Sequence, residues 1–98
     1  MKITEIFKQQ KRTFSFEFFP PRDEISALDF GINIGQLMNL EPSFVTVTYG
    51  AGGSTQERTF AIVDYLHNRI GLTCMAHYTC VNASKEKIRE DIKYLSKI

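Results

Sequence analysis

The sequence predicts an α/β fold in which helices and strands alternate around a parallel sheet. Three segments with the two-residue alternation of strands are each followed by a segment with the spacing of an amphipathic helix. Each unit takes roughly 30 residues, the length of a strand–helix–strand crossover, which joins parallel neighbours. Two folds contain such a sheet and both remain possible from these patterns: a doubly wound open sheet and part of a (βα)₈ barrel.

The first unit follows a short charged helix expected over residues 4–12, with Thr4 as its N-cap. Residues 13–19 alternate between apolar and polar side chains and predict a strand. One face of it is aromatic: Phe14, Phe16 and Phe18. Pro20-Pro21 ends it, because proline has no N–H to give to the sheet.

The first unit continues with a helix expected over residues 26–39. Ser26 and Asp29 have the spacing of a capping box, although two internal glycines weaken the helical propensity. Residues 43–49 are rich in β-branched and aromatic side chains and predict the second strand.

The helix of the second unit has the clearest start in the chain, where Ser54 and Glu57 form a capping box after the glycine loop 50–53. Four apolar residues recur at helical spacing: Phe60, Val63, Leu66 and Ile70. Gly71 stands where a C-terminal glycine belongs. The third strand is expected over 72–80, and a last helix after Ser84, with Ile88, Ile92 and Leu95 on its apolar side.

The two cysteines both fall in the third predicted strand. Six extended residues span about 20 Å, whereas a disulfide needs Cα atoms within about 7 Å, so Cys74 and Cys80 cannot pair there. Reduced thiols fit a cytoplasmic protein. The alternation also places His77 on the face opposite both cysteines, so no metal site is expected.

The composition is that of an ordinary globular domain, with 98 residues, 43% of them hydrophobic and 23% charged. The net charge of +1 argues against a nucleic-acid partner. We expect no membrane partner and a cytoplasmic location, because no apolar run could span a bilayer and the N-terminus lacks a secretory signal.

Polar side chains gather where the predicted strands end, which is where parallel α/β folds build their sites. Glu17, Thr48 and His77 fall on the more polar faces of their strands. Burial of Glu17 in a phenylalanine-rich stretch would disfavour its charged form and suit a general acid; the alternative is a strand glutamate paired with Arg22. For His77 the alternative is a hydrogen-bonded structural histidine. The glycine loop 50–53 either cradles an anion or makes a tight turn.

Three segments together resemble the methylenetetrahydrofolate reductases. They are FSFEFFPPR at 14–22, VTVTYGAGGST at 45–55 and AHYTC at 76–80. The resemblance implies a (βα)₈ TIM barrel, of which residues 1–98 supply the N-terminal part, about the first three βα units. A complete barrel takes about 250 residues.

The resemblance also implies a flavoprotein that binds FAD and takes its electrons from NADH or NADPH. The reaction is reduction of 5,10-methylenetetrahydrofolate to 5-methyltetrahydrofolate, in one-carbon metabolism and methionine biosynthesis. The small-molecule folate is the expected partner, and the complete enzyme is expected to be a homo-oligomer. The 98-residue chain alone is expected to be inactive.

Residue by residue, Glu17 matches the family's catalytic acid, which helps to open the folate ring to the reactive iminium. Thr48, Tyr49, Ala51 and His77 match positions that contact the flavin or lie close to it. The family's later Arg-Gly-Asp motif is not in these 98 residues. Two other interpretations stay open: another FAD-dependent (βα)₈ oxidoreductase, or a truncated, non-catalytic paralogue that acts as a binding partner.

Overall fold

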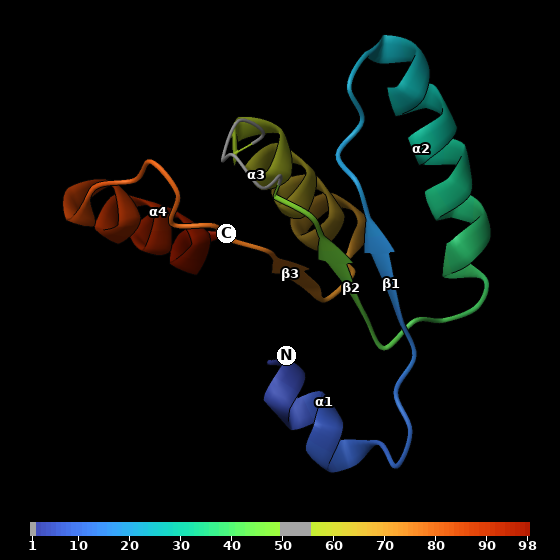
Figure 1. Cartoon of the computed structure of the whole chain (residues 1–98). Helices are drawn as coiled ribbons and strands as arrows, with labels where there is room; N and C mark the ends of the chain where they lie inside the picture. Colours follow the sequence, from blue (N-terminus) through green and yellow to red (C-terminus); the bar gives the residue numbers. More distant parts are fainter. Residues whose placement is uncertain (1, 50–55) are drawn as a thin grey trace.

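The computed structural model describes residues 2–49 and 56–98. Three parallel strands and their helices follow the predicted order (Figure 1). In chain order the elements are α1 (Ile3–Gln9), β1 (Ser15–Phe18), α2 (Glu24–Met38), β2 (Phe44–Val47), α3 (Gln56–Asp64) with its continuation η1 (Tyr65–Ile70), β3 (Cys74–Ala76) and α4 (Lys85–Lys97).

The three strands form one sheet in sequential order, β1-β2-β3, and both pairs are parallel. Glu17 lies opposite Thr46, and Thr46 lies opposite Met75. The register therefore places these three side chains in one row across one face of the sheet, as the alternation of each strand predicts. We call this face, which also carries Ser15, the open face.

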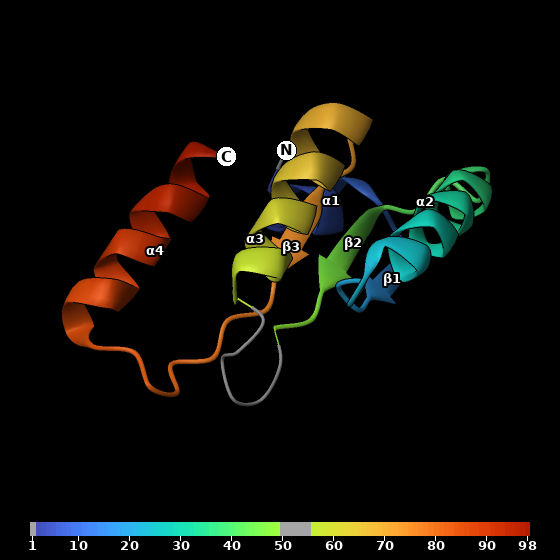
Figure 2. The same cartoon turned by 90° about the horizontal axis from the view of Figure 1, so that it is seen from above.

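The opposite face holds the core. Val45 and Val47 are fully buried there, and Ile34 of α2 and Leu66 of η1 belong to the same cluster. Helices α2 and α3 thus cover the same face, while α4, α3 and α2 follow one another across the view from above (Figure 2). A doubly wound sheet has helices on both faces and a reversal of strand order. Sequential strands with their helices on one side are instead the wall of a (βα)₈ barrel.

The helix starts differ from two expectations. Helix α1 begins at Ile3 with Lys2 as its N-cap residue, and Glu5 accepts a hydrogen bond from the Lys2 N–H at 3.1 Å, so Thr4 is not the cap. Helix α2 begins at Glu24, because the Asp23 carboxylate accepts from the Ser26 N–H at 2.7 Å. Despite its two glycines, α2 runs over 15 residues.

The strands are shorter than their sequence patterns, and β3 most of all. It ends at Ala76 rather than Cys80, because its partner β2 ends at Val47, the residue paired with Ala76. The His77 N–H continues the ladder by one step, donating to the Val47 carbonyl at 2.9 Å. Both cysteines are free thiols, as predicted. The glycine loop and the Ser54 capping box lie outside the described residues.

The predicted end of the third helix and the predicted start of the last helix are confirmed. Gly71 ends η1 with a φ of 83°, and the Ser84 side chain caps α4 by accepting from the Lys87 N–H. One expectation for α4 is wrong: Ile92 is 56% exposed, and Asp91 is buried in its place. None of the described helices is long and apolar enough to cross a membrane.

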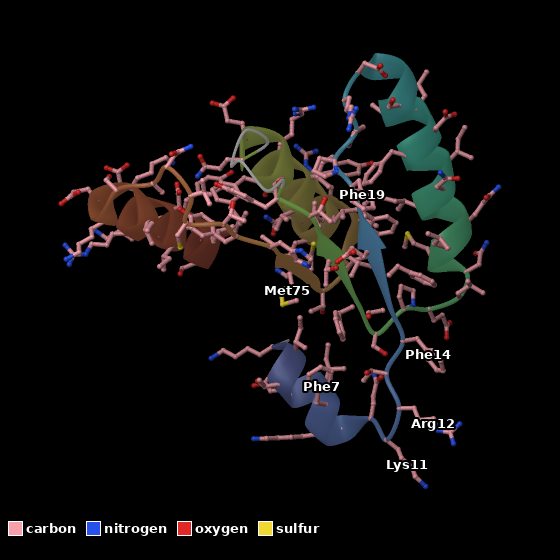
Figure 3. The ribbon with its side chains drawn as sticks, in the orientation of Figure 1. Phe7, Lys11, Arg12, Phe14, Phe19 and Met75 are labelled. Atoms are coloured by element: carbon pink, nitrogen blue, oxygen red, sulfur yellow. The ribbon has the colours of Figure 1, made fainter. Side chains whose placement is uncertain are left out.

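Helix α1 lies at the amino-terminal end of the sheet, away from the ends where Thr48 and His77 follow their strands (Figure 1). Its Ile6 is buried, and Phe7 makes an edge-on contact with Phe44 at 5.8 Å between ring centroids. Figure 3 shows Phe14 and Phe19 beyond the two ends of β1, where both are mostly exposed.

Candidate functional site

A carboxylate–imidazole pair stands on the open face near the carboxyl ends of the strands. The Nε2 atom of His77 lies 3.3 Å from Oε1 of Glu17, and the Thr46 hydroxyl donates to the same oxygen at 3.5 Å. The Glu17 side chain is 52% exposed and that of His77 38% exposed, so a ligand on the open face can reach both. Three neighbouring strands therefore bring together two residues that are 60 positions apart in the sequence.

Backbone hydrogen bonds hold the three segments of the site in register. The Thr48 N–H donates to the Phe18 carbonyl at 2.9 Å, and His77 is tied to Val47 in the same way. The hydroxyl of Thr59 in α3, which is fully buried, donates to the Thr48 carbonyl at 2.8 Å. Thr48 is therefore fixed both by the sheet and by the helix behind it.

The surroundings of Glu17 differ from the expected aromatic pocket. Phe16 and Phe18 belong to the core on the other face, because successive side chains of a strand point to opposite sides. The partners of the carboxylate are His77 and Thr46, not Arg22. Among the described residues, the surroundings of Glu17 are thus its two polar partners and solvent, rather than an apolar pocket.

Tyr49 lies on the other side of the sheet from Glu17. Its side chain is 5% exposed, and its ring packs against Phe60 at 6.3 Å and Tyr78 at 5.1 Å between centroids. Burial is the main cause that raises the pKa of Tyr49 above its ordinary value, and the charge of Asp91 adds to it. Ala51, the other predicted cofactor residue on this segment, lies outside the described residues.

Behind the site lies a buried carboxylate that the sequence interpretation missed. Asp91 is 4% exposed and accepts hydrogen bonds from Tyr78 at 2.6 Å, from Gln56 and from Lys87. Burial alone would raise the pKa of Asp91, but the three hydrogen bonds hold it below its ordinary value. The available signal was its position: Asp91 interrupts the apolar stripe of α4 between Ile88 and Leu95.

No cluster of three or more metal-ligating side chains occurs in the part of the chain that the structure describes. The residues on the open face do fit part of a flavin site. Thr48 and His77 carry a hydroxyl and an imidazole at the carboxyl ends of two adjacent strands, and these groups can bind the polar atoms of a cofactor.

The sequence comparisons agree with this geometry. The family model described as methylenetetrahydrofolate reductase matches residues 2–98. The chain belongs to the methylenetetrahydrofolate reductase family. It is 42% identical over 82 residues to 5,10-methylenetetrahydrofolate reductase of Pectobacterium carotovorum, covering 84% of this chain and 28% of that protein.

Two further relatives show the same partial coverage. The chain is 40% identical over 75 residues to 5,10-methylenetetrahydrofolate reductase of Escherichia coli, which covers 76% of this chain and 25% of the relative. It is 39% identical over 87 residues to methylenetetrahydrofolate reductase (NADH) 1 of Arabidopsis thaliana, which covers 89% of this chain and 15% of the relative. The chain thus corresponds to a minor part of the length of each of these family members.

Proposed function

We propose that this chain supplies the first three βα units of a flavin-dependent reductase that converts 5,10-methylenetetrahydrofolate to 5-methyltetrahydrofolate in the cytoplasm. The observation that carries the proposal is the Glu17–His77 pair on the open face of a barrel wall. The family match over residues 2–98 supports it. In this proposal the complete enzyme serves one-carbon metabolism and methionine biosynthesis and is a homo-oligomer.

In the proposed reaction Glu17 is the general acid. Its carboxyl group gives a proton to the folate so that the five-membered ring opens to the iminium. His77 Nε2, at 3.3 Å, and the Thr46 hydroxyl hold the acidic oxygen in one position. General acids of this kind contribute about 10²–10⁴-fold to rate.

The proposed cofactor residues are Thr48, Tyr49, Ala51 and His77. These residues would hold FAD, which when bound would supply hydride transfer between NADH or NADPH and the folate. His77 lies beside Glu17 on the open face and would supply a side-chain hydrogen bond. Thr48, two residues after Thr46, falls on the same face by the alternation of the strand and would supply another. Tyr49 contributes through its backbone, because its ring is buried against Phe60.

The test is made on the complete protein that carries these three units. We expect it to be purified with the visible absorbance of a flavin, to lose that absorbance with NADH or NADPH, and to regain it on addition of 5,10-methylenetetrahydrofolate. Reoxidation by a different amine or iminium substrate alone would indicate another flavin oxidoreductase. A protein without flavin would support the non-catalytic paralogue.

A further inference from the structure

The segment that carries His77 leaves the sheet at this residue. Strand β3 ends at Ala76, and the His77 N–H to Val47 carbonyl bond continues its ladder by one step. The next residue, Tyr78, points to the other side, where its ring lies 5.1 Å from that of Tyr49 and 6.4 Å from that of Phe60. The orientation of His77 is therefore set by the ladder before it and by Tyr78 after it.

Tyr78 is in turn held by Asp91. Its hydroxyl donates to the Asp91 carboxylate at 2.6 Å, and this hydrogen bond is the largest cause that raises the pKa of Tyr78 above its ordinary value. Asp91 also accepts from Gln56, the first residue of α3, and from Lys87 of its own helix. One carboxylate thus joins α4, the start of α3 and the segment after β3.

A charge at this place is not explained by the packing of α4. The helix presents Ile88, Leu95 and Ile98 on the same stripe, so an apolar residue at 91 would continue the stripe without the cost of desolvating a carboxylate. A buried carboxylate with three donors from separate segments is instead suited to fixing their relative orientation. The donor nearest to the site is Tyr78, the neighbour of His77.

We propose that Asp91 and Tyr78 are positioning residues that set the orientation of His77 toward Glu17. The inference rests on the proposed function, because it concerns the pair to which that function assigns the chemistry. Neither residue touches the reacting groups. Each acts through the backbone between Tyr78 and His77, which places the two side chains on opposite sides of the segment.

The test follows the ring nitrogens of His77 by long-range ¹H–¹⁵N correlation spectra of the chain, without flavin or folate. With Tyr78 and Asp91 unchanged, Glu17→Gln should shift the Nε2 resonance of His77, since the carboxylate is 3.3 Å away. In a Tyr78→Phe background the same substitution should leave this resonance unshifted. His67, whose Nδ1 pairs with the Leu72 carbonyl, serves as internal reference.

Matched variants separate positioning from stability. Tyr94→Phe removes a hydroxyl from the same aromatic cluster, without a bond to Asp91, and should keep the full response of His77 to Glu17→Gln. Asp91→Asn keeps an acceptor for Tyr78 and should keep most of the response of His77 to Glu17→Gln. Asp91→Leu fills the space without an acceptor and should lose this response.

A full response of His77 in folded Tyr78→Phe or Asp91→Leu protein would overturn the proposal, as would the absence of any response in the unmodified protein. If both variants unfold, the pair serves stability and the positioning role is rejected. Since no flavin is needed, failure of the proposed function leaves this result unaffected.

Discussion

Replacing Val47 by alanine tests whether only one face of this sheet is covered by helices. Val47 is fully buried beneath the helices, on the face that also packs Ile34 and Leu66. The substitution removes two buried carbon atoms, each worth about 0.8 kcal/mol of transfer free energy. The cavity left behind adds to this loss, so we expect unfolding free energy to fall by about 2–3 kcal/mol.

The matched control is Met75→Ala on the open face, in the adjacent strand. Met75 is 44% exposed, so its truncation should cost less than about 1 kcal/mol, although methionine is the larger side chain. Urea unfolding followed by circular dichroism measures the free energy of unfolding of both variants. The slope of this free energy against urea concentration should be unchanged, which shows that each variant unfolds from an equally compact native state. Equal losses for the two variants would show that the Met75 face is covered as fully as the Val47 face, and would refute the one-sided packing of this chain.

Three further predictions concern the rest of the described chain. Gly71→Ala should lower the free energy of unfolding by about 1–2 kcal/mol, because the φ of residue 71 is 83°. Gly31→Ala should raise it by about 0.5–1 kcal/mol, because nothing lies near the added carbon. Melting temperatures that move in the same direction for both variants would contradict these two predictions. At pH 8 a thiol reagent should label exposed Cys80 well before Cys74, since burial raises the pKa of the Cys74 thiol to about 11; equal labelling rates would contradict this. The pKa of Asp91 in the folded state lies below its ordinary value. The stabilisation by this carboxylate is therefore complete above its unfolded-state pKa and is lost as the pH falls through its folded-state pKa. Asp91→Asn should make the free energy of unfolding depend less on pH in the acid range, and an unchanged pH dependence would argue against the Asp91 network.

Local periodicity was sufficient to predict the sheet and its two faces. The alternation of β1, β2 and β3 puts Glu17, Thr46 and Met75 in one row, and the register confirms this. The side chosen by a strand residue depends only on its position in that strand, which the sequence shows directly. The same alternation explains why Glu17 does not lie in the expected aromatic pocket: it places Phe16 and Phe18 on the opposite face of the sheet.

Features that depend on contacts between distant segments could not be predicted. The end of β3 at Ala76 follows from the length of β2. Helix α2 starts two residues early because Asp23 caps it by accepting from the Ser26 N–H. The burial of Asp91 was not predicted, although helical spacing places this residue on the stripe of Ile88 and Leu95. Its burial depends on the donors that Tyr78 and Gln56 bring from other parts of the chain.

The central claim is that Glu17 on the open face is the acid of a folate-reducing flavoenzyme. Stopped-flow measurement of the two half-reactions of the complete protein, with Glu17→Gln, tests it most directly. We predict that reduction of the flavin by NADH keeps nearly its full rate, while reoxidation by 5,10-methylenetetrahydrofolate falls by about 10²–10⁴-fold. If both half-reactions fall equally, or reoxidation is unchanged, Glu17 is not the acid.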